Sequence, residues 1–335
     1  MKQTYFFYPG NDDVFFDALA DINNSQFREK GIIVRKQIYV KGQNKIDRIK
    51  NKITWKTNIF FILNCINMFF SPFLKIKKDL KVRGEKIFVF SNLTIKMLPI
   101  QLIKKINLRR DCKIVVYLID NSDNPLCKEA IYLCNKFHFD SVYTFNSKDA
   151  EKYNFKHIYY IYSKLPFKAK SGHKPKRQIV FFGSNKGRFP IFLKILKALQ
   201  KKQISFFFSL IGINSDEKKK LAIYPNVEIN NPISYKALVK KIQDYNVLLD
   251  IVATKEAGLS YRPIEAICYN KKLLTNNKKI LDFPYYDPEY MKYFEKVEDI
   301  DWNFVQENKP VDYKYNNDYS PVEFLKKIQK EINKK

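Results

Sequence analysis

The segment that decides the fold runs from Val247 to Pro288 and reads VLLDIVATKEAGLSYRPIEAICYNKKLLTNNKKILDFPYYDP. An apolar run of strand length is followed by a polar loop with Gly258, a short helix and a second apolar run, residues 272–275. The order strand, polar loop, helix and strand is typical of an α/β sheet that presents a ligand at the carboxyl ends of its strands. Amides at a helix start and a nearby arginine, here Arg262, favour an anionic ligand, above all a phosphate.

The apolar pattern on either side of this segment predicts that strands and helices alternate along the whole chain. In the first half we predict strands over 3–8, 31–40, 86–92, 113–120, 141–146 and 157–163, and helices over 14–23, 45–80 (broken at Pro72), 93–107 and 125–137. In the second half we predict strands over 178–183, 204–212 and 246–252, helices over 189–202 and 235–245, and a last amphipathic helix that Ser320 caps.

The stretch KLPFKAKSGHKPKR, residues 164–177, is charged, contains two prolines and has no apolar period, which is the composition of a linker. We therefore predict two doubly wound α/β domains, over residues 1–165 and 177–318, with a linker over 166–176. Residues 319–335 form a C-terminal helix.

The net charge of +27 is concentrated near the N-terminus. Residues 27–110 hold 21 Lys and Arg against 4 Asp and Glu, a net of +17. This balance favours a polyanionic partner, namely nucleic acid, anionic lipid or a phosphorylated substrate, although a solvated lysine-rich surface also accounts for it. The apolar window 59–70 is too short to span a membrane and fits either an interfacial helix or a buried one. No secretory signal is recognisable at the N-terminus.

A polar turn follows the first strand of the second half and reads GSNKGR, residues 183–188. Gly183 lets the backbone approach a ligand, and Ser184, Lys186 and Arg188 can donate to phosphate oxygens. The turn has neither the Walker A ending nor the G-x-G-x-x-G spacing, so a simple strand-to-helix turn is the alternative.

Arg262 and Glu265 lie within one helical turn, just after the turn that Gly258 and Leu259 begin. An arginine at this edge of a sheet can stabilise the charge that develops on a diphosphate, and a glutamate can accept hydrogen bonds from ribose hydroxyls. A local ion pair at a helix start is the alternative interpretation.

In the first half, Asp120 ends the most apolar strand, where a carboxylate can serve as general base or cap the next helix. Gly10 and Asn11 follow the first strand and can approach an acceptor sugar. The five cysteines and three histidines have no metal-ligand spacing, and we expect the Asp299-Ile300-Asp301 string to lie on the surface.

The order YLIDNSDN, FDSVYTFNSKDAEKYNF and VFFGSNKGRF, followed by the segment quoted first, resembles bacterial surface-polysaccharide glycosyltransferases of the GT-B fold. These are lipopolysaccharide or capsule biosynthesis proteins, and some are CgeB-like. The resemblance covers residues 114–325 and is sharpest at 258–265, 271–275 and 285–286. Related retaining enzymes often have two glutamates eight residues apart here, whereas Glu256 and Glu265 are nine apart. We therefore assign no catalytic role to Glu256, and the stereochemical outcome stays open.

The resemblance implies two Rossmann-like domains, an acceptor-side N-terminal domain and a C-terminal domain that binds the nucleotide-sugar, with the last helix packing back on the first domain. It implies a glycosyltransferase that needs no metal or other cofactor. The acceptor is then a lipopolysaccharide, capsule or other lipid-linked glycan, and the protein is cytoplasmic and peripheral to the inner face of the membrane. The alternatives are a non-catalytic scaffold homologue and a basic nucleic-acid-binding protein. No nucleic acid is expected, because helix-turn-helix, zinc and aromatic RNP signatures are missing.

Overall fold

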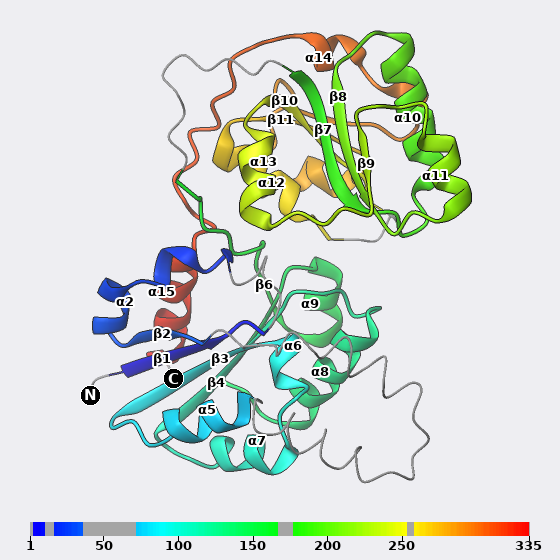
Figure 1. The fold of residues 1–335 in the computed structure, drawn as a ribbon. Helices are drawn as coiled ribbons and strands as arrows, with labels where there is room; N and C mark the ends of the chain where they lie inside the picture. The colour runs from blue at the N-terminus through cyan, green and yellow to red at the C-terminus, as the bar shows by residue number, and fades with distance from the viewer. Residues whose placement is uncertain (1–2, 11–16, 36–71, 167–176, 253–257, 335) are drawn as a thin grey trace, which may run out of the picture. The chain divides into compact units, whose positions relative to one another are not determined.

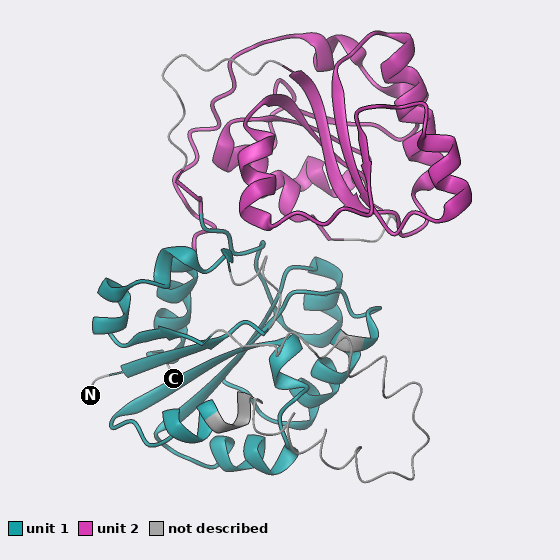
Figure 2. Ribbon diagram, viewed as in Figure 1, with its two compact units in different colours: residues 1–163, 321–335 teal, residues 164–320 magenta. Residues whose placement is uncertain are grey.

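The computed structural model describes residues 3–10, 17–35, 72–166, 177–252 and 258–334. The chain divides into two compact units (Figure 2). Unit 1 comprises Met1–Ser163 and Pro321–Lys335, and unit 2 comprises Lys164–Ser320. Each unit contains its own six-stranded parallel sheet and its own buried core.

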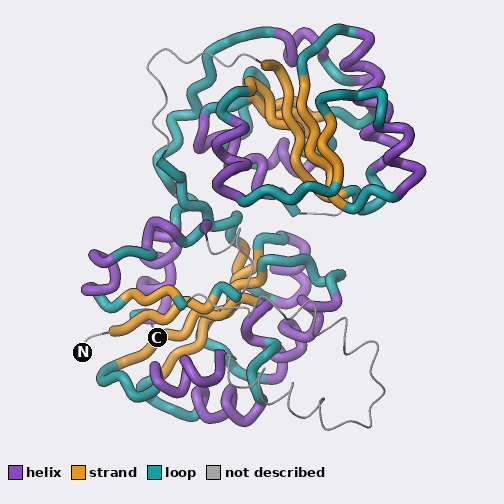
Figure 3. Tube along the Cα trace, viewed as in Figure 1, coloured by secondary structure: helices purple, strands orange, loops and turns teal. Residues whose placement is uncertain are grey.

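The sheet of unit 1 has the strand order β2-β1-β3-β4-β5-β6, and all neighbouring strands are parallel (Figures 1 and 3). Its strands are β1 (Gln3–Tyr8), β2 (Ile32–Val34), β3 (Glu85–Ser91), β4 (Cys112–Leu118), β5 (Ser141–Thr144) and β6 (Lys156–His157). The central strands are apolar on both faces, which is expected where helices cover both sides of a parallel sheet.

Alternate residues of these strands bury against opposite layers. Phe88, Phe90 and Val116 belong to the core that helices α5 (Pro72–Asp79), α7 (Ile100–Asn107) and α8 (Pro125–Lys136) complete. The shorter helices are α2 (Ser25–Glu29), α6 (Asn92–Ile95) and α9 (Ser147–Tyr153).

The C-terminal helix α15 (Pro321–Ile332) belongs to unit 1. Its Phe324 ring lies 5.5 Å from Tyr117 and 5.2 Å from Tyr143 between ring centroids. Its Glu331 accepts hydrogen bonds from Ser141 (3.1 Å) and Tyr143 (2.5 Å) and pairs with Lys156. The predicted crossover helix is therefore confirmed.

The sheet of unit 2 has the order β12-β11-β10-β7-β8-β9, again all parallel. Its strands are β7 (Arg177–Ser184), β8 (Phe206–Ile211), β9 (Val227–Ile229), β10 (Tyr245–Asp250), β11 (Lys272–Thr275) and β12 (Met291–Tyr293). Its helices are α10 (Phe189–Lys201), α11 (Ser215–Leu221), α12 (Tyr235–Ile242), α13 (Tyr261–Tyr269) and α14 (Trp302–Gln306). In Figure 1, α10 and α11 cover one face of the sheet, and α12 and α13 cover the other.

The strand order reverses between β1 and β3 in unit 1 and between β7 and β10 in unit 2. At such a switch point the two following loops leave on opposite faces, and a crevice forms outside the carboxyl ends of the strands. Each unit therefore has one edge where a ligand is expected.

Several predictions of local structure differ from the structure. Of the strand predicted over 157–163, only His157 belongs to β6, and the Ile158 amide makes one further bond to β5 at the Thr144 carbonyl (3.0 Å). Beyond Ile158, side chains of this segment bond to loop carbonyls. Ser163 donates to the Ala18 carbonyl (2.8 Å), and Tyr160 donates to the Ile119 carbonyl (3.2 Å). Helix α9, which Asn146 caps, was not predicted.

Other predictions fall partly or wholly on residues that the structure does not describe. The strand predicted over 31–40 is described only as β2, and the basic helix predicted over 45–80 only as α5. The interfacial window 59–70 lies outside the described residues. Among the residues that are described, no helix has the length and apolarity needed to cross a membrane.

Candidate functional site

The predicted residues of unit 2 gather at the switch point between β7 and β10. The turn 185–188 follows β7 and leads into α10, while α13 begins shortly after Asp250 ends β10. Interactions across the sheet tie the two segments together.

The Arg188 guanidinium spans the switch point. It donates to the Asn185 carbonyl (3.2 Å), to the Ser184 carbonyl at the end of β7 and to the Ile251 carbonyl after β10. Burial lowers the pKa of Arg188, nearby Asp250 opposes this shift, and the positive charge of Arg262 adds to it. Arg188 thus holds the two strand ends together, and its remaining N–H groups have no protein acceptor among the described residues.

Gly183 makes the position of Arg188 possible. A Cβ atom at residue 183 would lie 2.9 Å from Cζ of Phe181 and 3.3 Å from Nη2 of Arg188. Phe181 packs below the guanidinium, with Cζ of Arg188 5.6 Å from the ring centroid. A side chain at 183 would therefore clash with Phe181 and press on the guanidinium that joins the strands.

Arg262 and Glu265 form a buried ion pair at the start of α13, with side chains 15% and 0% exposed. Arg262 also donates to the Phe182 carbonyl of β7 (3.2 Å), and the second oxygen of Glu265 accepts from Tyr235 (2.7 Å). The pKa of Arg262 is raised: burial acts to lower it, but Glu265 and Tyr235 outweigh that effect. Both Glu265 oxygens are therefore engaged within the protein, so the expected ribose contact would require one of these bonds to open.

Asp250 lies beside these groups and was not predicted as a site residue. Its carboxylate accepts from Ser260 (2.9 Å) and Thr275 (3.0 Å), and Ser260 also caps α13 through the Arg262 amide (3.1 Å). Burial raises the pKa of Asp250 although these two hydroxyls and both arginines act to lower it. The signal that pointed to Asp120, a carboxylate ending an apolar strand, would also have identified Asp250.

The remaining predicted donor residues differ in exposure. Lys186 is exposed in a left-handed conformation (φ 43°) and has no hydrogen bond or ion pair with a described residue. Gly258 and Leu259 are buried before α13, and the Gly258 carbonyl accepts from Asn277 (3.1 Å). Asn185, between Ser184 and Lys186, donates to Glu217 (2.9 Å), while its buried Oδ1 has no hydrogen-bond partner among the described residues.

In unit 1, the predicted residues lie at the corresponding edge of the sheet. Asp120 follows β4 and is half-buried, and its Oδ2 accepts from Asn92 (2.9 Å), which follows β3. Gly10 follows β1 with φ 87°, and a Cβ there would lie 3.0 Å from Cβ of Leu93. Asn11 lies outside the described residues. The β1–β3 switch point therefore brings Gly10 close to the segment that holds Asp120 in place.

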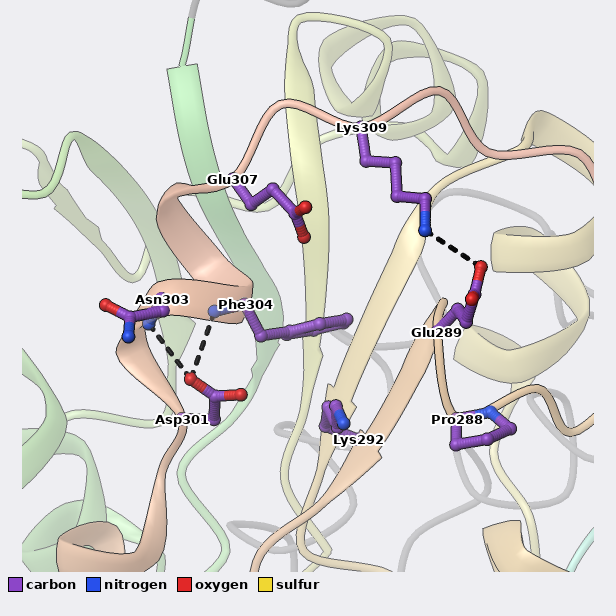
Figure 4. Close-up of a pocket in the computed structure, with 8 residues that line it drawn as sticks. All are labelled: Pro288, Glu289, Lys292, Asp301, Asn303, Phe304, Glu307 and Lys309. Atoms are coloured by element: carbon purple, nitrogen blue, oxygen red, sulfur yellow. Dashed lines mark hydrogen bonds and ion pairs between the residues drawn. The ribbon is translucent and has the colours of Figure 1, made fainter.

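A cavity of about 640 Å³ lies elsewhere in unit 2, against edge strand β12 and helix α14 (Figure 4). Glu289 and Lys309 form an ion pair across it (2.9 Å), and Asp301 caps α14 by accepting from the Asn303 and Phe304 amides. Asp299 and Asp301 are both exposed, which confirms the surface position predicted for this string. None of the described residues predicted for the site lines this cavity.

No family model matches the chain, and no curated protein matches it. Among solved structures, the chain is similar to HepE of Anabaena in complex with UDP-glucose, with a TM-score of 0.57 and 9% sequence identity over 99% of this chain and 100% of that chain. It is also similar to a putative UDP-N-acetylglucosamine 2-epimerase from Listeria monocytogenes (TM-score 0.52, 7% identity, 100% and 97% of the two chains). A UDP-N-acetylglucosamine 2-epimerase from Rickettsia bellii gives a TM-score of 0.50 at 10% identity, over 100% and 96% of the two chains. At such low identities these similarities concern the fold alone.

Proposed function

The chain has the two-domain α/β architecture of the GT-B fold, and from this premise we propose that it transfers a sugar from a nucleoside-diphosphate donor to a glycan acceptor. The observation that carries the proposal is the pair of arginines at the β7–β10 switch point. Arg188 and Arg262 come from segments far apart in sequence, yet each binds a backbone carbonyl at the end of β7.

The donor diphosphate binds at this edge in the proposal. Arg262 is 15% exposed, and several of its N–H groups have no protein acceptor among the described residues. Lys186, in the turn that follows β7, and the amino-terminal end of α13 add positive potential at this edge of the sheet. The helix contributes mainly through its dipole, because Ser260 takes the Arg262 amide and Pro263 has no N–H. Guanidinium groups already fixed by backbone carbonyls need no reorganisation when charge develops on the leaving diphosphate, which is the condition for electrostatic catalysis.

Glu265 acts as a positioning residue in this scheme. Its carboxylate accepts a hydrogen bond from Tyr235 on one oxygen and pairs with Arg262 on the other, and its side chain is 0% exposed. It fixes the direction of the Arg262 guanidinium, which an unpaired arginine side chain would not keep. This role replaces the ribose contact expected from the sequence.

Asp120 is the proposed base on the acceptor side. Asn92 holds one carboxylate oxygen, and the other has no hydrogen bond with a described residue, so it remains available to accept a proton from an acceptor hydroxyl. We propose that the acceptor is a lipid-linked surface glycan and that the basic N-terminal region docks at an anionic membrane surface.

Because guanidinium groups supply the countercharge to the diphosphate, we propose that transfer needs no bound metal. Chelation with EDTA should leave turnover unchanged, whereas loss of turnover that Mg²⁺ restores would contradict this part of the proposal.

The central test is binding of UDP-sugars to the full chain by calorimetry, with release of UDP as the catalytic readout. Arg262→Lys keeps a cation beside Glu265 but loses the planar fork, so it should weaken UDP-glucose binding at least tenfold while the protein stays folded. Arg177→Lys makes the same change in the arginine that begins β7, far from the Phe182 carbonyl that Arg262 contacts, and serves as the matched control. Equal effects of the two changes, or undiminished binding in Arg262→Lys, would exclude a diphosphate role for Arg262.

Similarity to the two epimerases motivates a second candidate, inversion at a sugar carbon of UDP-N-acetylglucosamine. Proton NMR separates the two reactions, because epimerisation changes the sugar spectrum without an acceptor. Appearance of a second N-acetylhexosamine in that assay would replace transfer by epimerisation.

A further inference from the structure

Unit 1 contains a smaller, strongly basic cavity of about 360 Å³ that none of the roles described so far uses. The described residues that line it are Val34, Arg35, Lys75, Lys78 and Asp79. Arg35 follows β2, and its amide donates to the Phe7 carbonyl of β1 (2.8 Å). The cavity therefore includes a residue from the carboxyl edge of the sheet, the edge to which Gly10 and Asp120 also belong.

The carboxylate that lines the cavity, Asp79, already accepts hydrogen bonds from other side chains of unit 1. Asp79 is 1% exposed and accepts a bidentate pair of hydrogen bonds from Nε and Nη2 of Arg35. It also accepts a hydrogen bond from the buried Tyr8 hydroxyl, and burial together with the Asp79 charge raises the pKa of Tyr8. This network, in which Tyr8 also interacts with Arg35, fixes the guanidinium plane, and the two hydrogen bonds to Asp79 do not use Nη1.

Two lysines complete the cavity from α5. Lys75 and Lys78 are three residues apart and therefore lie on the same face of the helix, beside Asp79. Burial lowers the pKa of Lys75, and the positive charge of Arg35 contributes to this shift. Three cations against one carboxylate make the described lining basic, which favours an anionic group.

We propose that this cavity binds a phosphate group carried by a ligand. Arg35 presents a fixed guanidinium edge, the geometry that favours a phosphate oxygen pair, and the lysines supply point charges. The volume lies at the low end of the range for small-molecule sites, roughly 300–1,000 Å³, and so suits a phosphate and part of the group that carries it. The role we assign to the phosphate, anchoring a phosphorylated acceptor, rests on the proposed function; the binding does not.

The test uses phenyl phosphate as the probe, titrated calorimetrically into the full chain at constant ionic strength. Lys78→Ala should weaken binding about tenfold, the value expected for one charge-assisted contact. Arg35→Lys should weaken it as well, because it keeps a cation beside Asp79 but removes the second guanidinium edge. Lys81→Ala, an exposed lysine one turn further on that does not line the cavity, removes the same charge and should leave binding unchanged.

Absence of saturable binding to the wild-type protein overturns the proposal, and so does an equal loss in Lys81→Ala and Lys78→Ala. UDP-glucose binding by Lys78→Ala should remain at the wild-type level, so failure of this site and failure of the donor site give different results.

The source of the phosphate is settled by competition with lipid vesicles. Displacement of phenyl phosphate by phosphatidylglycerol vesicles but not by phosphatidylcholine vesicles identifies a lipid headgroup. Undiminished phenyl phosphate binding in the presence of both identifies a phosphate ester on a soluble or chain-linked ligand. Either result supports the phosphate site.

Discussion

The buried pair of Arg262 and Glu265 makes a quantitative prediction about stability. In Arg262→Ala, the Glu265 carboxylate keeps the Tyr235 hydrogen bond but loses its only ion-pair partner among the described residues, at a position that is 0% exposed. Adding Glu265→Gln removes the charge and keeps an amide oxygen that can still accept from Tyr235.

Removing one partner of a buried ion pair costs about 3–5 kcal/mol. The lower end applies to this pair, because water reaches the 15% exposed arginine and Tyr235 still donates to the glutamate. We therefore expect Arg262→Ala to reduce the free energy of unfolding of unit 2 by about 3 kcal/mol. For a unit of this size that corresponds to a decrease in Tm of about 6–12 °C. The double variant should recover about 1–2 kcal/mol, because it leaves no buried charge unpaired.

Urea unfolding followed by tryptophan fluorescence measures this effect in unit 2 alone. The chain has two tryptophans, Trp55 and Trp302, and Trp302 packs against the core of unit 2. In a Trp55→Phe background the signal therefore reports that unit. Two results would refute the reasoning: Arg262→Ala as stable as the wild type, or a further loss of stability when Glu265→Gln is added. Either would show that Arg262 does not stabilise the buried charge of Glu265.

Three further changes have defined outcomes. Gly183→Ala places a Cβ 2.9 Å from Phe181 and should reduce the free energy of unfolding of unit 2 by about 1–3 kcal/mol in the same urea assay. A urea midpoint equal to that of the wild type would contradict the close packing at this position. The buried Lys271 has its pKa lowered to about 8 by desolvation, from 10.5 in the unfolded chain, so the unfolded state binds more protons between these pH values and stability should rise with pH across that window. Lys271→Met should reduce the rise, and identical pH profiles for the two proteins would refute the assignment. Phe324→Ala should cost about 3–5 kcal/mol in unit 1 while leaving the Trp302 transition in place, and a shift of that transition would show that helix α15 also stabilises unit 2.

Local signals in the sequence were sufficient for most of the fold. The apolar run over 272–275 coincides with β11, and the helix predicted over 235–245 begins as α12 at Tyr235, where Ser234 accepts from the Ala237 amide. Prediction was weakest at the edge of the unit 1 sheet. Residues 157–163 have strand composition, but after Ile158 the Tyr160 and Ser163 side chains bond to loop carbonyls that only the folded unit brings near.

For the candidate site, the sequence predicts which segments take part, and the structure adds the contacts that each side chain makes. Arg188 and Glu265 were both assigned to the donor. The structure shows Arg188 joining two strand ends, and Glu265 holding Arg262 without reaching solvent. Asp250 has the same local signal as Asp120, a carboxylate that ends an apolar strand, but only the structure shows that two hydroxyls and two arginines surround it.

The sequence by itself determined where strands and helices form and which loops follow the carboxyl ends of the strands, because apolar period and capping residues act over a few positions. The tertiary structure alone decided what each polar side chain bonds to. Arg188 reaches a carbonyl 63 residues away, and Arg262 reaches one 80 residues away. Such contacts depend on strand order and register, since a guanidinium is directed by whichever carbonyls and carboxylates the packed sheet places around it.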